Sequence, residues 1–188
     1  MDFVEPSGNG FQNYVWDTQS LNLLATDNEM IECCKRAYIV GHRYYITLVQ
    51  VRELAGWPDR KMNYDDPNAW GTRQDETFRI METLDFHRLS CVAVLYPGFT
   101  ILDGSMRLLG DSGLRMDMFY DIYNNNNHHK RDAIIAEAVV YHGCTLVTND
   151  ERLRKKVNKY FPGTAITYAE YKNVLSSIDI REDSDHAD

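Results

Sequence analysis

The sequence lacks a long apolar run, a paired-cysteine framework and a secretion signal. No stretch approaches the roughly 18 consecutive apolar residues of a membrane-spanning helix. The first residues carry neither the basic head nor the apolar core of a signal peptide. The four cysteines form no CxxC pair, which argues against a zinc knuckle or a disulfide scaffold. We therefore expect a cytoplasmic protein with reduced thiols and no membrane contact.

Basic residues are also scarce. The chain has 20 Lys and Arg against 28 Asp and Glu, a formal net charge of −8, which disfavours broad, non-specific binding of nucleic acid. Half of this charge lies in residues 179–188, where five acids stand against one arginine. Such a composition is typical of a solvated acidic tail.

Several catalytic motifs are missing. There is no glycine-rich phosphate loop, and neither Ser105 nor Ser112 stands in a nucleophile elbow. A phosphatase that uses Asp17 as its nucleophile would need an Asp-x-Asp pair, but position 19 is Gln. These absences weigh against nucleotide-binding P-loop proteins, serine hydrolases and aspartyl phosphatases.

What the sequence does contain is a regular alternation of short apolar runs with amphipathic segments. The runs predict strands at 14–16, 44–48, 99–102, 144–147 and 164–167, and helical spacing predicts helices at 27–38, 70–84, 114–123, 132–142, 151–160 and 169–175. This alternation favours an α/β fold with a central parallel sheet. The 188 residues can bury a single sizeable core. We therefore predict one domain over 1–178, with 57–97 as an inserted loop and helix, followed by the tail.

Four acids stand where such a sheet would gather them. Asp17 and Asp150 directly follow apolar runs, Asp132 opens a predicted helix, and Glu53 lies on a helical turn after the second strand. The carboxyl ends of parallel strands meet at the edge where ligands bind. Carboxylates gathered there repel one another unless cations intervene, and oxygen ligands suit Mg²⁺ or Mn²⁺.

Each acid also has a structural explanation. Asp is a favoured helix N-cap, and Thr148-Asn149-Asp150-Glu151 fits a capping box in which Thr148 caps the helix. Glu29 and Glu32, on the preceding predicted helix, are alternatives to Glu53.

With these residues in place, the sequence resembles the PIN-domain nucleases, including the VapC-like toxins of bacterial toxin–antitoxin pairs. The resemblance rests on Val15-Trp16-Asp17-Thr18, on Ile46 to Leu54 with Glu53, on Asp132-Ala133-Ile134-Ile135-Ala136, and on Leu146-Val147-Thr148-Asn149-Asp150. It implies a three-layer α/β/α fold with a central parallel sheet and a metal-dependent endoribonuclease activity. It also implies that Asp17, Glu53, Asp132 and Asp150 form the metal-binding catalytic quartet, with Thr148 as a polar assistant.

The expected reaction is hydrolysis of RNA phosphodiester bonds with Mg²⁺ or Mn²⁺. Arg131, Arg152 and Lys155 flank the acids and are candidates to contact phosphates of single-stranded or structured RNA. The resemblance further implies a homodimer and a possible antitoxin partner. The alternative is a catalytically inactive PIN-like module that binds RNA or a protein and keeps the acids as helix caps and surface charge.

Overall fold

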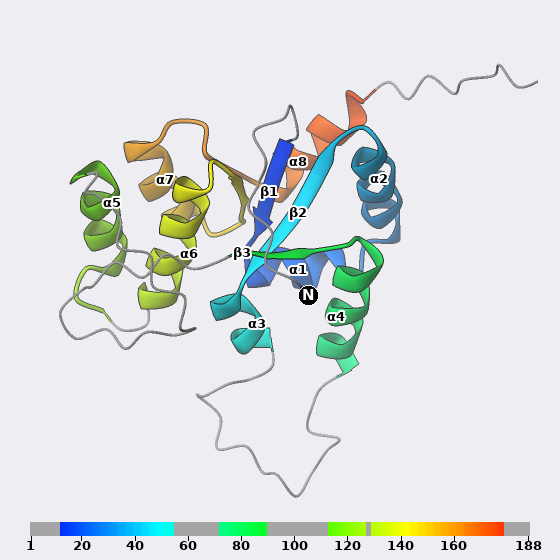
Figure 1. The fold of residues 1–188 in the computed structure, drawn as a ribbon, viewed down its shortest axis with the longest axis horizontal. Helices are drawn as coiled ribbons and strands as arrows, with labels where there is room; N and C mark the ends of the chain where they lie inside the picture. Colours follow the sequence, from blue (N-terminus) through cyan, green and yellow to red (C-terminus); the bar gives the residue numbers. More distant parts are fainter. Residues whose placement is uncertain (1–11, 55–71, 90–112, 127–128, 179–188) are drawn as a thin grey trace, which may run out of the picture.

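The structure is a computed structural model that describes residues 12–54, 72–89, 113–126 and 129–178. Five parallel strands form one sheet in the order β3-β2-β1-β4-β5 (Figure 1). The strands are β1 (Gln12–Trp16), β2 (His42–Thr47), β3 (His87–Leu89), β4 (Thr145–Val147) and β5 (Ala165–Ile166). The parallel sheet that the sequence predicts is therefore present.

Helices cover both faces of this sheet. They are α1 (Thr18–Leu24), α2 (Asn28–Ile39), α3 (Leu48–Leu54), α4 (Thr72–Thr83), α5 (Gly113–Tyr123), α6 (Lys130–Tyr141), α7 (Glu151–Tyr160) and α8 (Tyr168–Ser176). Figure 1 shows α5, α6 and α7 on one side of the sheet and α2 and α4 on the other. No described helix is long and apolar enough to cross a membrane.

Two hydrophobic clusters explain the three layers. Successive side chains of a strand point to opposite faces, so Tyr14 and Trp16 of β1 join the cluster under α1, α2, α4 and α8. Val15, between them, joins the other cluster under α5, α6 and α7. Each face of the sheet is thus covered by its own helices, and polar residues lie at the ends of the strands.

The observed elements differ from the predicted ones at three places. The edge strand β3 was not predicted, and the predicted strand at 99–102 lies outside the described residues. Helix α6 begins at Lys130, so Asp132 lies in its first turn instead of opening it. Most of the 57–97 insertion and the whole tail also lie outside the described residues, so the domain boundaries stay a prediction.

The asparagine-rich segment before α6 has a local conformational role. Asn124 and Asn125 adopt left-handed backbone angles, with φ of 44° and 52°. Asn accepts this region more readily than most residues. The asparagines therefore end α5 and turn the chain toward α6. Among the described cysteines, Cys33, Cys34 and Cys144 are free thiols.

Candidate active site

Strand register places Asp17 beside Thr148. Trp16 at the end of β1 is paired with Val147 at the end of β4, and the Asp17 amide donates to the Val147 carbonyl at 3.0 Å. The next residue of each strand therefore meets its neighbour at the carboxyl edge of the sheet. The hydroxyl of Thr148 donates a hydrogen bond to Asp17 Oδ2.

Asp17 is a buried carboxylate with polar partners on both oxygens. Its Oδ1 accepts from the Ser20 amide at 2.6 Å and so caps α1. Burial raises the pKa of Asp17, the hydrogen bonds from Thr148 and Ser20 oppose this rise, and the nearby Asp150 adds to it. Among the described residues, no cation forms an ion pair with Asp17. Asp17 thus caps α1, and its carboxylate has no positively charged partner among the described residues.

Asp150, and not Thr148, is the N-cap of α7. Asp150 Oδ1 accepts from the Leu153 amide at 3.0 Å, whereas Thr148 Oγ1 accepts from the Asp150 amide at 3.0 Å. The predicted capping box at Thr148 is therefore wrong. The reason is register, since Thr148 is one residue beyond β4 and its buried hydroxyl is already committed to Asp17.

Asp132 reaches the same group of acids from α6, through an arginine. Nη2 of Arg152 lies 2.5 Å from Asp132 Oδ2 and 3.5 Å from Asp150 Oδ2, so one guanidinium nitrogen faces both carboxylates. Burial raises the pKa of Asp132, Arg152 opposes the rise, and Asp150 adds to it. His129 lies 3.8 Å from the same carboxylate. Asp150 is therefore electrostatically coupled to both Asp17 and Asp132.

Glu53 is linked to the group from α3. Its Oε2 accepts from the hydroxyl of Thr18 at 2.6 Å, and Thr18 is the neighbour of Asp17. Its Oε1 lies 3.8 Å from Nη1 of Arg131. The two alternatives lie elsewhere, because Glu29 pairs with Lys172 and Glu32 with Lys35, each at 2.7 Å.

Gln50 is a positioning residue that sequence reasoning missed. Its buried side chain donates to the Trp16 carbonyl and accepts from the amide and hydroxyl of Thr47, both at 2.9 Å. These bonds fix the first turn of α3 against the ends of β1 and β2. The available signal was a polar residue two positions after the predicted strand, which alone does not distinguish an anchor from a solvent-exposed side chain.

The acids offer only oxygen donors, which is the chemistry that Mg²⁺ and Mn²⁺ prefer. Within the described part of the chain, however, no three His, Cys, Asp or Glu side chains are close enough to hold one ion. Arg152 lies between Asp132 and Asp150, and Arg131 lies beside Glu53. The oxygen donors are therefore of the kind that a divalent ion binds, but in this arrangement the acids are paired with arginines.

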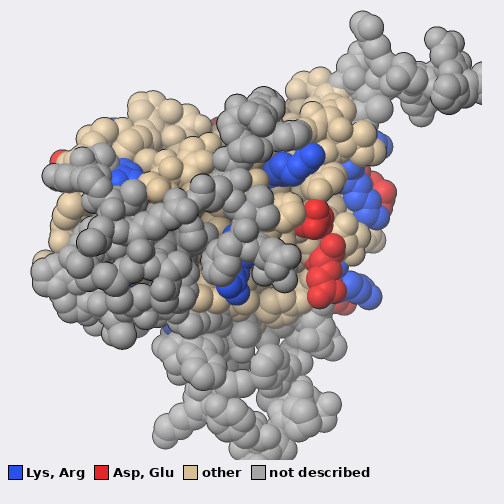
Figure 2. Space-filling view, in the orientation of Figure 1, with Lys and Arg blue, Asp and Glu red and all other residues tan. Residues whose placement is uncertain are grey.

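The predicted phosphate contacts are all engaged with acids. Besides the two arginines, Lys155 pairs with Glu151 at 2.7 Å on the exposed side of α7. On the face shown in Figure 2, the described Lys and Arg side chains are scattered among neutral residues and form no continuous basic stripe.

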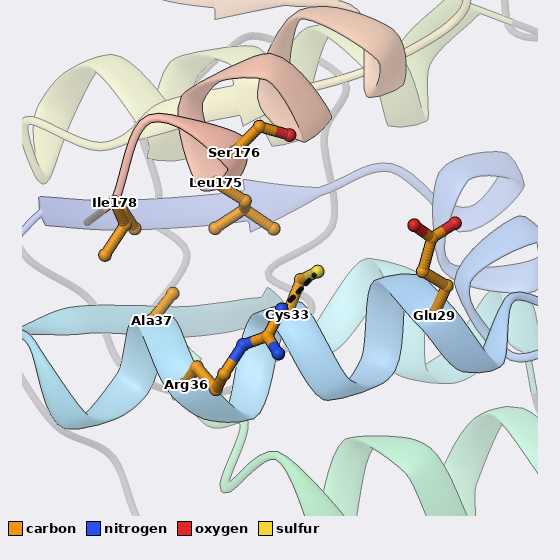
Figure 3. A pocket seen from close by; sticks show the side chains of 7 residues that line it. All are labelled: Glu29, Cys33, Arg36, Ala37, Leu175, Ser176 and Ile178. Atoms are coloured by element: carbon orange, nitrogen blue, oxygen red, sulfur yellow. Dashed lines mark hydrogen bonds between the residues drawn. The ribbon is translucent and has the colours of Figure 1, made fainter. Parts of the chain in front are cut away.

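A cavity of about 650 Å³ lies away from this edge, between α2 and α8 (Figure 3). It is lined by Glu29, Cys33, Arg36, Ala37, Leu175, Ser176 and Ile178. Its charged groups are already partnered, since Glu29 pairs with Lys172 and Arg36 donates to Cys33 Sγ at 3.1 Å. The cavity contains no member of the predicted quartet, so the candidate active site stays at the carboxyl edge of β1 and β4.

Comparison with known proteins bears on the fold. No protein-family model matches the sequence, and no curated protein matches it. A solved structure similar to this chain is PAE2754 from Pyrobaculum aerophilum, with 18% sequence identity, a TM-score of 0.50, and coverage of 90% of this chain and 98% of that chain. VapBC2 from Rickettsia felis, bound to a DNA fragment from their promoter, matches at 11% identity and a TM-score of 0.40, covering 83% of this chain and 98% of that chain. At 18% identity the likeness to PAE2754 concerns the fold, and it agrees with the PIN-like α/β/α architecture that the sequence predicts.

Proposed function

We propose that this protein is a metal-dependent endoribonuclease of the PIN type. The observation that carries the proposal is that Asp17, Asp132 and Asp150 come from three separate elements and are linked to one another at one edge of the sheet. The Thr148 hydroxyl bonds both Asp17 Oδ2 and the Asp150 amide, and Arg152 Nη2 contacts the carboxylates of Asp132 and Asp150. Helix capping accounts for Asp17 and Asp150 but gives no reason for Asp132 to share their environment. Gathering like charges is costly, and a cation-dependent reaction is a function that requires it.

The residues that would hold Mg²⁺ or Mn²⁺ are Asp17, Asp132 and Asp150, with Glu53 beside them. When bound, the ion supplies an activated water and positive charge next to the scissile phosphate. Thr148 holds Asp17 in place through its hydroxyl, and Gln50 fixes the helix that carries Glu53. Asp17 and Asp150 cap helices, Asp132 lies in the first turn of α6, and Glu53 lies in the last turn of α3, so rigid elements position the reacting groups.

The proposed substrate is single-stranded RNA or an exposed RNA loop. Arg131 and Arg152 contact the acids, and Lys155 lies on the exposed side of α7. These side chains would contact phosphates, which position RNA without reading its sequence. An antitoxin protein and a second copy of the chain are the partners that the resemblance to VapC-like toxins implies. In this proposal the protein is the toxin of such a pair and cleaves a cellular RNA.

The test is RNA cleavage by purified protein with Mg²⁺, with Mn²⁺ and with a chelator, for the wild type and for Asp150→Asn and Asp132→Asn. We expect cleavage only with metal, and a loss of at least about a hundredfold in each variant, because the amide keeps the shape of the side chain but removes the charge that the cation needs. The free energy of unfolding of Asp150→Asn should lie within about 1 kcal/mol of the wild-type value, because Asn also caps helices.

Asp27→Asn is the matched control. Asp27 caps α2 as Asp150 caps α7, each accepting at 3.0 Å from the amide three residues on, but it lies outside the acidic group. This variant should cleave RNA like the wild type. Full activity of Asp150→Asn and Asp132→Asn would reject the nuclease assignment and favour the alternative of a non-catalytic binding module.

A further inference from the structure

The acidic group already contains a counter-ion that belongs to the chain. Arg152 Nη2 faces Asp132 and Asp150 together, at 2.5 and 3.5 Å. About a third of each of the three side chains is exposed, with 34%, 29% and 37% for Arg152, Asp132 and Asp150. The cluster is therefore close enough to the surface for the guanidinium to exchange with solvent or ligand.

One arginine does not neutralise the group. Asp17, Asp132 and Asp150 bring three formal negative charges, and Arg152 supplies one positive charge. Glu53 has its own partner in Arg131 at 3.8 Å. Two formal negative charges are left, which is the charge that one divalent cation neutralises. The ring of His129 also lies beside Asp132.

We infer that Arg152 is an exchangeable counter-ion, an inference that rests on the proposed function. Without metal, Arg152 holds Asp132 and Asp150 together against their mutual repulsion. When a divalent cation binds these carboxylates, Arg152 leaves them and becomes free to contact an RNA phosphate. Arg152 is thus a positioning residue that competes with the metal and cooperates with the substrate.

Arg152 Nη2 contacts both carboxylates, so it must leave them before one ion can bind both. Arginine suits this exchange because its planar fork pairs equally well with carboxylates and phosphates. A lysine at position 152 would pair with either group only as a point charge, and an apolar residue would pair with neither.

The experiment measures Mn²⁺ binding to the full chain without RNA, from the electron paramagnetic resonance signal of free Mn²⁺. We compare the wild type with Arg152→Gln. Removing a competing unit charge a few ångströms from the ion should tighten binding by on the order of tenfold. RNA cleavage by the same variant should fall, because its phosphate contact is lost.

Arg154→Gln is the matched control, because it removes the same charge from the same helix and Arg154 forms no ion pair with any described aspartate. It should change Mn²⁺ affinity less than about twofold. Melting temperatures are recorded on all samples, and Arg152→Met, which keeps the alkyl stem, replaces Arg152→Gln if the latter fails to fold.

The outcomes separate the two proposals. Equal or weaker Mn²⁺ binding in Arg152→Gln, with clear binding in the wild type, overturns the counter-ion role and leaves the nuclease proposal standing. Absence of Mn²⁺ binding in the wild type and in every variant overturns the nuclease proposal itself. Tighter binding in Arg152→Gln alone supports the exchange.

Discussion

At the scale of single residues, Thr148 shows how one side chain can serve both fold and chemistry. Its buried hydroxyl donates to Asp17 Oδ2 and accepts from the Asp150 amide at 3.0 Å. It therefore connects the end of β1 to the start of α7. Leaving a buried acceptor or donor unsatisfied costs more than the hydrogen bond itself contributes.

We predict that Thr148→Val lowers the free energy of unfolding by about 1–3 kcal/mol, because it leaves Asp17 Oδ2 and the Asp150 amide without their partners. RNA cleavage should fall as Asp17 loses its fixed orientation. Thr148→Ser keeps the hydroxyl and should stay closer to the wild type on both measures. Urea denaturation and the cleavage assay check this prediction, and a Thr148→Val protein as stable as the wild type would contradict it.

At the scale of elements, a buried carboxylate joins α5 to α6. Glu137 is only 2% exposed, and its Oε1 has no hydrogen-bond partner among the described residues. Arg115 of α5 lies 3.8 Å away. Burial raises the pKa of Glu137 from 4.5 to about 7, and Arg115 only partly offsets this.

This shift predicts a pH dependence of stability. Between pH 4.5 and about 7 the folded state keeps a proton that the unfolded chain releases, so the contribution of Glu137 is present below pH 4.5 and is lost as pH rises through about 7. Relative to the wild type, Glu137→Gln should gain stability with rising pH, up to about 3 kcal/mol at pH 8.

Urea denaturation at pH 5, 6, 7 and 8 measures this difference. Glu29→Gln is the control, because its side chain is 74% exposed, so the loss of its surface ion pair should change the free energy of unfolding by at most about 1 kcal/mol. Parallel curves for Glu137→Gln and the wild type would show that the carboxyl titrates normally in the folded protein.

The same elements show what the sequence could predict. The segment 151–160 has clear helical periodicity, and residues 14–16 form an unbroken apolar run. Helix α7 and strand β1 appear at these positions. Strand β3 has only three residues, His87, Arg88 and Leu89, of which only Leu89 is buried, so it carries no alternating pattern. It exists because it pairs with β2 at the sheet edge.

The positions of the candidate site residues follow from strand ends, but their partners do not. Asp17 and Thr148 meet because β1 and β4 are neighbours in register. A predicted parallel sheet places both residues at its carboxyl edge but does not say which strands are neighbours. Arg152 is separated from Asp132 by 20 residues, and Arg131 from Glu53 by still more. Such pairings depend on how helices pack across the sheet, and local sequence patterns do not encode them.

At the scale of the whole molecule, the charge distribution opposes the proposed substrate. The formal net charge is −8, and residues 179–188 contribute five acids and one arginine to it. Long-range repulsion of RNA slows association most at low ionic strength, where the Debye length is about 30 Å at 0.01 M against about 3 Å at 1 M. We therefore expect the tail to slow the encounter with RNA without changing the stability of the fold.

We predict that a chain ending at residue 178 keeps its melting temperature and cleaves RNA about two- to fivefold faster than the full chain at low salt, because its net charge is halved. The advantage should vanish near 0.5 M salt, where screening removes the long-range term. A full-length variant with the five tail acids replaced by Asn or Gln separates charge from length, and it should match the shortened chain. A salt-independent difference, or one seen only on truncation, would mean that the tail acts by contact or bulk, and a fall in melting temperature would place the domain boundary beyond residue 178.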